Sequence, residues 1–140
     1  MEKYVHSIRM TVPFSDIDMM GHVNNARYFT YLETVRAEHM YNLTKGKDAD
    51  GLGVIIARAE IDYKAPARWL DALIVKMRTI AVGNSSWTYE YEIFDEKNNW
   101  VIAVGKTVQV AYDYRTRTPI PIPPDMKEKL LGEIEETKDS

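Results

Sequence analysis

The chain has 140 residues, enough for one domain with its own core, and its 45% hydrophobic and 28% charged residues exclude a disordered protein. It contains no cysteine, which excludes disulfides, thiolate metal sites and a cysteine nucleophile. The formal net charge of −3 argues against nucleic acid as a partner, because phosphate binding requires a basic surface. No stretch approaches the about 18 apolar residues of a membrane span, and residues 1–10 do not resemble a signal peptide, so we expect a cytoplasmic protein without membrane partners.

A strand and a long helix are the first predicted elements. Polar and apolar residues alternate between residues 4 and 12, and Pro13 ends the strand because proline cannot donate to a ladder. Residues 24–43 repeat with a helical period and have only a thin polar stripe, which predicts a mostly buried helix. Its apolar side carries Tyr28, Phe29, Leu32, Val35, Met40 and Leu43. Gly46 follows as a helix stop.

Four more strands are predicted after the helix. Residues 55–64 alternate strictly between apolar and charged side chains, and a third strand spans about residues 70–81. Gly83 and Asn84 form a hairpin turn to the fourth strand, which carries Trp87, Tyr89, Tyr91 and Ile93 on one face. The fifth strand has large apolar residues at alternate positions, namely Trp100, Ile102, Val104, Val108, Val110, Tyr112 and Tyr114. A short helix begins at about Asp125, and residues 132–140 are expected to fray.

This order predicts an α+β fold in a single domain covering residues 1–140. Because no helix lies between the later strands, parallel winding is disfavoured, and a curved five-stranded antiparallel sheet around one long helix fits better. One helix cannot cover both faces and both edges of such a sheet. We therefore expect a homo-oligomer, a dimer or tetramer, that hides an edge strand.

The segment between the first strand and the long helix, residues 14–25, gathers the residues able to do chemistry. Gly21 allows close approach of the backbone to a ligand, and unpaired N–H groups at a helix start can stabilise an oxyanion. A nearby carboxylate can attack a carbonyl or activate water. Structural roles compete with these: Asp16 can hold a turn, and Asn24 or Asn25 can cap the helix.

The same segment resembles a known signature. Asp16-x-Asp18-x-x-Gly21-His22-Val23-Asn24-Asn25, followed by an aromatic-rich helix with Glu33-x-x-Arg36, is similar to hot-dog-fold acyl-CoA thioesterases of the 4-hydroxybenzoyl-CoA thioesterase-like family. Weaker likenesses at residues 61–66, 70–73 and 117–121 extend it over nearly the whole chain. The resemblance implies a hot-dog fold and an enzyme that hydrolyses an acyl-CoA or acyl-carrier thioester to acid and thiol. It implies no cofactor apart from the coenzyme A of the substrate.

The resemblance also implies roles for individual residues. Asp18 is the catalytic carboxylate, as nucleophile or as general base, and Asn25 lines the acyl pocket. The thioester oxygen binds backbone N–H groups of Gly21, His22 and Val23. Residues expected to contact the substrate are Asn24, Asn25, Tyr63, Lys64 and Arg68. Arg58 and Arg117 are further candidates for the phosphates, although any of these cations can be an ordinary surface charge.

Two other functions compete with hydrolysis. A thioester hydratase or dehydratase would use His22 together with Asp18, and a non-enzymatic module would bind an acyl thioester without cleaving it. No metal is expected, because the three histidines, His6, His22 and His39, lack the spacing of common metal motifs. Glu33 and Arg36 are expected to form a structural ion pair, and His39 to be hydrogen-bonded and partly buried.

Overall fold

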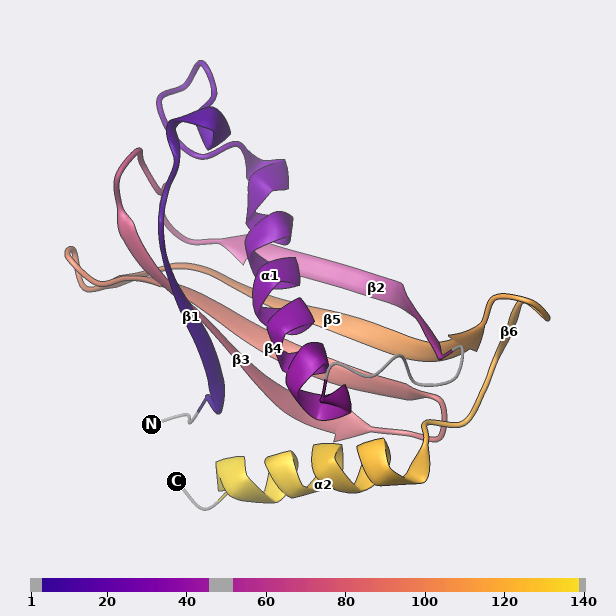
Figure 1. Ribbon diagram of the computed structural model, residues 1–140. Helices are drawn as coiled ribbons and strands as arrows, with labels where there is room; N and C mark the ends of the chain where they lie inside the picture. The colour runs from indigo at the N-terminus through magenta and orange to yellow at the C-terminus, as the bar shows by residue number, and fades with distance from the viewer. Residues whose placement is uncertain (1–3, 46–51, 139–140) are drawn as a thin grey trace.

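The computed structural model describes residues 4–45 and 52–138. In chain order its elements are β1 (His6–Thr11), the short 3-10 helix η1 (Phe14–Asp16), α1 (Asn25–Thr44), β2 (Gly53–Tyr63), β3 (Ala72–Val82), β4 (Ser86–Asp95), β5 (Trp100–Asp113), β6 (Thr118–Pro119) and α2 (Pro124–Lys138). The main strands form one antiparallel sheet in the order β1-β3-β4-β5-β2, and β6 pairs with β5. Figure 1 shows α1 lying across one face of this sheet. The predicted α+β hot-dog architecture is confirmed, with the two-residue β6 as an addition.

The long helix is positioned from its first residue. Asn24 is its N-cap, and the side-chain Oδ1 accepts a hydrogen bond from the Ala26 N–H at 2.9 Å. The helix ends at Lys45, which has a φ of 57°, while the predicted stop, Gly46, lies outside the described residues. The residues that α1 buries are Tyr28, Tyr31, Leu32, Val35 and His39. The prediction of a mostly buried helix is wrong for the single chain, because the sheet covers only one side and leaves Phe29 38% exposed.

The strands differ in what they turn toward the core. Trp87, Tyr89, Tyr91 and Ile93 of β4 are all buried. In β5 the large Ile102 is buried beside a register shift with β4, and from there on the buried set at alternate positions is small or polar: Ala103, Gly105, Thr107, Gln109 and Ala111. The large residues Val104, Val108 and Val110 are only half-buried. The reason is close packing, since a Cβ on Gly105 would lie 2.8 Å from the Glu60 carbonyl oxygen and 3.4 Å from Leu32 Cδ1.

Two further sequence predictions need correction. The pairing of β2 with β5 shifts register between Ile56 and Arg58, so a bulge interrupts the strict alternation expected along β2. The C-terminal helix α2 continues to Lys138, so the expected fraying is wrong for residues 132–138. Buried Met126 and Leu130, together with contacts to β3, hold α2 in place. Within the described residues, neither helix has the length and apolar character needed to cross a membrane.

Two glycines provide a matched test of this packing. Gly105→Ala should destabilise the fold by about 2 kcal/mol, because the new methyl group meets backbone that cannot move aside. Gly132→Ala should stabilise it by about 0.5–1 kcal/mol, since this helical glycine has nothing within 4 Å of its Cβ position. Thermal or urea unfolding of the two variants shows whether each substitution stabilises or destabilises the fold. Equal effects of the two substitutions would contradict the close contact between Gly105 and the backbone of β2.

The predicted ion pair between Glu33 and Arg36 forms, but its charged atoms are far apart for an ion pair. The Arg36 side chain is 16% exposed and that of Glu33 is 71% exposed, with 4.0 Å between their charged atoms. Arg36 also donates a hydrogen bond from Nη1 to the Tyr91 hydroxyl at 3.2 Å. Arg36 is thus held by the buried tyrosine of β4 as well as by its helix neighbour.

We therefore expect a modest effect of Arg36→Leu. Leucine keeps the apolar contacts of the arginine stem but removes the hydrogen bond to Tyr91, so unfolding should become easier by about 1 kcal/mol with little change in turnover. The control Glu33→Gln should change stability by less than about 0.5 kcal/mol. Melting curves and turnover numbers test this. An Arg36→Leu protein with unchanged melting but lost turnover would instead place Arg36 in the active site.

Candidate active site

The loop between η1 and α1 is closed on itself by backbone hydrogen bonds. Ile17 and Val23 form an isolated antiparallel bridge, and the Asp18 N–H donates to the His22 carbonyl at 3.1 Å. Gly21 donates to the Asp18 carbonyl at 3.0 Å and has a φ of +85°, a conformation that strongly favours glycine. The loop therefore presents the side chain of Asp18 from a defined backbone immediately before the long helix.

The Asp18 carboxylate is half-buried and lightly engaged. Its Oδ1 accepts a hydrogen bond from the Met20 N–H at 2.9 Å. Within the described residues this is the one hydrogen bond of the Asp18 carboxylate, and none of those residues donates to its Oδ2. An oriented carboxylate with a free oxygen has what a nucleophile or a general base requires.

Asp16, two residues earlier, is anchored much more firmly. Its Oδ2 accepts a hydrogen bond from the Tyr31 hydroxyl at 2.5 Å, and its Oδ1 lies 3.7 Å from Arg27 Nε. Burial raises the pKa of the Tyr31 hydroxyl, and the hydrogen bond to Asp16 raises it further. The Asp16 carbonyl also accepts the Asn24 N–H at 3.0 Å. These contacts support the structural role for Asp16, which joins the loop to α1.

The three backbone donors expected for an oxyanion are not equally available. Gly21 donates within the loop, and the Val23 N–H donates to the Ala67 carbonyl at 2.8 Å. The His22 N–H has no acceptor among residues 4–45 and 52–138, and neither has that of Asn25, the first residue of α1. In this conformation the open donors at the helix start are therefore His22 and Asn25. Asn25 was expected only to line the acyl pocket.

A pocket of about 240 Å³ brings together four of the residues expected to form the site. Its lining is His22, Asn25, Tyr28, Tyr63, Lys64, Ala65 and Pro66. The Tyr63 hydroxyl donates to the Asn25 carbonyl at 3.0 Å, which ties the end of β2 to the start of α1. Tyr28 was predicted only as a core residue, and its hydroxyl accepts the Ala67 N–H at 3.1 Å. Its helical spacing indicated burial and gave no sign of this contact.

Asp18 does not line that pocket. It lies in a separate pocket of about 520 Å³ with Asp16, Asn24 and Arg27 among its neighbours. Asn24 uses its side-chain oxygen to cap the helix, as the structural alternative predicted. In the single chain, therefore, Asp18 and Asn24 line one pocket, whereas the expected substrate residues Asn25, Tyr63 and Lys64 line another.

The expected phosphate-binding cations are also dispersed. Lys64 lines the smaller pocket, and the exposed Arg68 lines neither of these two pockets. Arg58 lies in the middle of β2 and its Nη2 is 3.3 Å from Glu60. Arg117 is placed at the wrong end of the sheet, because the β5–β6 turn adjoins Gly53 whereas Tyr63 ends β2 on the other side. Within a single chain Arg117 is therefore not part of this site.

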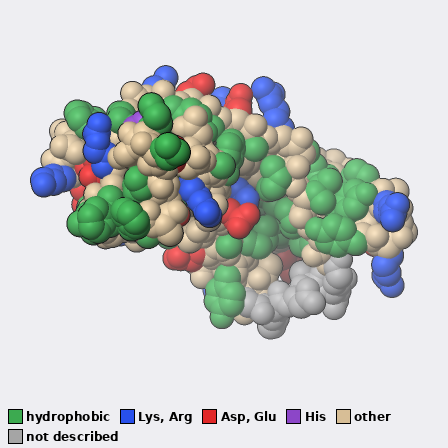
Figure 2. All heavy atoms as spheres, turned by 90° about the horizontal axis from the view of Figure 1, so that it is seen from above, with side chains coloured by type: hydrophobic (Ala, Val, Ile, Leu, Met, Phe, Trp, Pro, Cys, Tyr) green, Lys and Arg blue, Asp and Glu red, His purple; other side chains and the backbone are tan. Residues whose placement is uncertain are grey.

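The exposed surface around the loop is unusually apolar. Its large exposed side chains are Phe14, Met19, Met20, Trp69 and Leu70. The rings of Phe14 and Trp69 lie 5.4 Å apart, which joins the loop to the β2–β3 connection. Figure 2, which views the molecule from above Figure 1, shows hydrophobic side chains over much of this surface.

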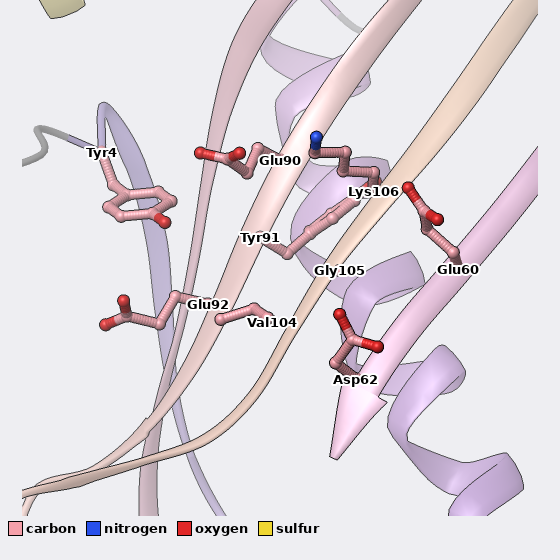
Figure 3. Close-up of a pocket in the computed structure, with 9 residues that line it drawn as sticks. All are labelled: Tyr4, Glu60, Asp62, Glu90, Tyr91, Glu92, Val104, Gly105 and Lys106. Atoms are coloured by element: carbon pink, nitrogen blue, oxygen red, sulfur yellow. The ribbon is translucent and has the colours of Figure 1, made fainter. Parts of the chain in front are cut away.

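A third pocket, of about 300 Å³, lies on the sheet face opposite α1 and is less suited to an acyl-CoA (Figure 3). Its charged lining is Glu60, Asp62, Glu90, Glu92 and Lys106. Glu90 is paired with Arg78 and Glu92 with Lys76, so two of these carboxylates are structural partners. An acidic lining repels the phosphates of coenzyme A. The loop before α1 is therefore the better candidate.

Comparison with known proteins agrees with this fold. The chain belongs to the Thioesterase-like superfamily, whose sequence model matches residues 12–130, and it is by class a thioester hydrolase. The Escherichia coli (strain K12) long-chain acyl-CoA thioesterase FadM is 26% identical over 116 residues, covering 81% of this chain and 88% of that protein.

Two other relatives extend the comparison. The uncharacterized protein YsmA of Bacillus subtilis (strain 168) is 32% identical over 83 residues, and this match spans 59% of the chain and only 56% of that protein. A crystal structure of a thioesterase from Thermus thermophilus, complexed with coenzyme A and Zn, superposes with a TM-score of 0.81. The two chains are 29% identical, and the match covers 96% of this chain and 98% of the Thermus thermophilus chain.

Proposed function

We propose that this thioester hydrolase is an acyl-CoA thioesterase in which Asp18 is the nucleophile or general base. The observation that carries the proposal is the closed loop before α1, since the same short segment holds a carboxylate with a free oxygen and leads into open N–H groups at the helix start. These are the two elements that thioester cleavage needs, since one supplies the attack and the other stabilises the negative oxygen.

The chemistry can follow either of two routes. As a nucleophile, Asp18 attacks the thioester carbonyl, the tetrahedral intermediate expels the coenzyme A thiolate, and water then hydrolyses the acyl–aspartyl anhydride. As a base, Asp18 takes a proton from the water that attacks directly. Both routes consume one water, whose oxygen ends in the carboxylic acid and one of whose protons is taken up by the expelled thiolate to give the thiol. The backbone N–H groups of His22 and Asn25 would stabilise the oxyanion. The proposal assigns no cofactor to this reaction.

Relatives and residues both support an acyl-CoA as the substrate. FadM is named as a long-chain acyl-CoA thioesterase, and the Thermus thermophilus structure contains coenzyme A. In this chain, Lys64 provides a cation at the pocket that also contains Asn25 and Tyr63. The exposed Met19 and Met20 favour a flexible apolar acyl group.

The hydratase alternative has less support. It requires the side chains of His22 and Asp18 to act on one substrate as an acid–base pair. The relatives compared above whose names state an activity are thioesterases, which favours hydrolysis over water addition. Thiol release from a panel of acyl-CoAs, followed with a thiol reagent, tests the proposed activity. Water addition to an enoyl-CoA without thiol release would favour the hydratase, and binding without either reaction would contradict the proposed turnover.

We further propose that the working enzyme is a homodimer or a larger homo-oligomer. The strand β2 is a sheet edge of 11 residues whose side chains are largely exposed, including Ile56 and Tyr63. Pairing of two such edges would bring a second copy close to Tyr63 and the pocket beside Asn25. This arrangement would complete a site whose two pockets are separate in one chain.

Light scattering tests the assembly. We expect a particle of at least twice the chain mass of 16.2 kDa, with thioesterase activity that falls on dilution together with the dimer. The measurement pairs light scattering with turnover over the same concentration series. A stable monomer with full activity would contradict the proposed assembly and leave the assignment of Asp18 untouched.

A further inference from the structure

Two histidines and a glutamate from distant parts of the chain converge beneath the far end of α1. His6 belongs to β1, His39 to α1 and Glu133 to α2. Glu133 Oε2 lies 2.8 Å from His6 Nε2 and 2.8 Å from His39 Nε2. The ligand atoms of all three residues lie within 4.8 Å of one another. By the 1.5 Å rise of a helix, His39 is about 20 Å along α1 from the loop that carries Asp18, so the cluster is separate from the proposed thioesterase site.

Each of the two inner residues is fixed by a second contact. Thr79 Oγ1 donates to Glu133 Oε1 at 3.0 Å, which orients the carboxylate and leaves Oε2 toward the histidines. The Tyr89 hydroxyl lies 2.8 Å from His39 Nδ1, and the His39 side chain is 1% exposed. With its proton on Nδ1, facing the tyrosine oxygen, His39 presents the Nε2 lone pair to the cluster. Such outer contacts are what orient the imidazole and carboxylate ligands of metal sites.

The cluster can be reached from solvent. A pocket of about 170 Å³ is lined by all three residues and also by Asn42, Lys45 and Lys129. A second pocket, of about 230 Å³, is lined by residues of β1 and α1 and also reaches His6 and His39. His6 is itself 25% exposed. An ion therefore has a route to the cluster, and the side facing the first pocket leaves room for a water or an anion as a fourth ligand.

We propose that His6, His39 and Glu133 bind one divalent transition-metal ion of the Zn²⁺ type. Two imidazole nitrogens and one carboxylate oxygen form a ligand set that zinc uses with an open fourth position, whereas Mg²⁺ and Ca²⁺ prefer oxygen ligands alone. The carboxylate offsets one charge of the ion. Binding requires each histidine to offer an unprotonated Nε2. Uptake of the ion therefore displaces the protons that now lie between these nitrogens and Glu133.

The ion would connect the first strand, the long helix and the last helix at one point. Its effect on this chain is therefore stabilising, and no part of thioester cleavage depends on it. Zn²⁺ at 100 times its Kd should raise the Tm of the chelator-treated protein by roughly 10 °C.

Co²⁺ is the probe for the test, because its visible absorption reports on ligand number and nitrogen coordination. The chelator-treated full chain is titrated with Co²⁺, followed by displacement with Zn²⁺. We expect one equivalent to bind with the absorption of a four-coordinate site. His6→Gln, which keeps a polar side chain at a partly exposed position, should weaken Co²⁺ binding by at least about tenfold. His22→Gln, which alters the one histidine outside the cluster, should leave Co²⁺ affinity unchanged.

Several outcomes would overturn the site. Equal Co²⁺ affinity for the wild type and His6→Gln would place the bound ion elsewhere. Absence of Co²⁺ uptake by the folded wild type below millimolar concentration would leave only a hydrogen-bonded cluster. If His6→Gln fails to fold, Glu133→Gln and the wild-type spectrum decide the question.

Discussion

Asp18→Asn should abolish thioester turnover while leaving the fold and substrate binding largely intact. The amide keeps the size of the carboxylate, and its oxygen can still accept the Met20 N–H that positions it now. It is, however, a poor nucleophile and a poor base. The open N–H groups of His22 and Asn25 are unaffected, so a substrate should still be bound and polarised. The loss of the attacking group should lower kcat by about 10² to 10⁴ or more.

Asp16→Asn is the matched control for that experiment. Its carboxylate holds the Tyr31 hydroxyl and lies near Arg27, so its neutralisation should cost about 1–3 kcal/mol of stability and little of kcat. Turnover of an acyl-CoA and thermal melts are measured on both variants. A folded Asp18→Asn protein with turnover near that of the wild type would refute the assigned role. A larger kinetic loss at Asp16 would mean that the other carboxylate is the catalyst.

The second large effect concerns stability in acid. Burial alone would raise the pKa of Glu133, but hydrogen bonds from His39 and His6, together with their charges, outweigh it and lower the pKa to about 2. A carboxyl group with a lowered pKa stabilises the folded state above its unfolded value of 4.5, and this contribution is lost as the pH falls from 4.5 toward 2. The expected loss is about 3 kcal/mol over that range.

His39 adds to the same trend at a higher pH. Burial lowers its pKa below the ordinary value of 6.5, so the unfolded chain takes up a proton before the folded protein does. Stability should therefore begin to decline as the pH falls below about 6.5, and the Glu133 contribution should follow.

Urea unfolding between pH 7 and pH 3 in the presence of a chelator measures both contributions. Glu133→Gln should lose about 2–3 kcal/mol at pH 7 and show a flatter decline below pH 4.5. Glu128→Gln, on the exposed side of the same helix, should behave like the wild type. If Glu133→Gln kept the full acid-induced loss, the stabilising role of its charge would be wrong.

The sequence predicted the elements well because their periods are strong. The alternation in β4 identified Trp87, Tyr89 and Tyr91 as core residues. The predicted start of the long helix is correct to within one residue, at its N-cap Asn24. The buried face of β5 was not readable in the same way. There the Glu60 carbonyl of the neighbouring strand β2 leaves no room for a side chain at Gly105, and the large valines occupy the opposite face. Hydrophobic size alone points to the wrong side of that strand.

The candidate site was partly accessible from sequence. The motif resemblance directed attention to the loop containing Asp18, and the structure brings His22, Asn25, Tyr63 and Lys64 together. Which N–H groups remain open could not be predicted, because this depends on the partner that each finds in the fold. The metal-ligand cluster had no local spacing to reveal it, since 127 positions separate His6 from Glu133.

That separation has a consequence for how the protein is made. A chain emerging from the ribosome presents β1 and α1 early, yet the helix that supplies Glu133, Met126 and Leu130 is synthesised last. Until α2 docks, β3 lacks its apolar cover and the two histidines lack their acceptor. Contacts between such distant residues close slowly, because the intervening chain must first be ordered. We expect the nascent chain to be most prone to aggregation in this interval, and a C-terminal truncation before α2 to extend it indefinitely.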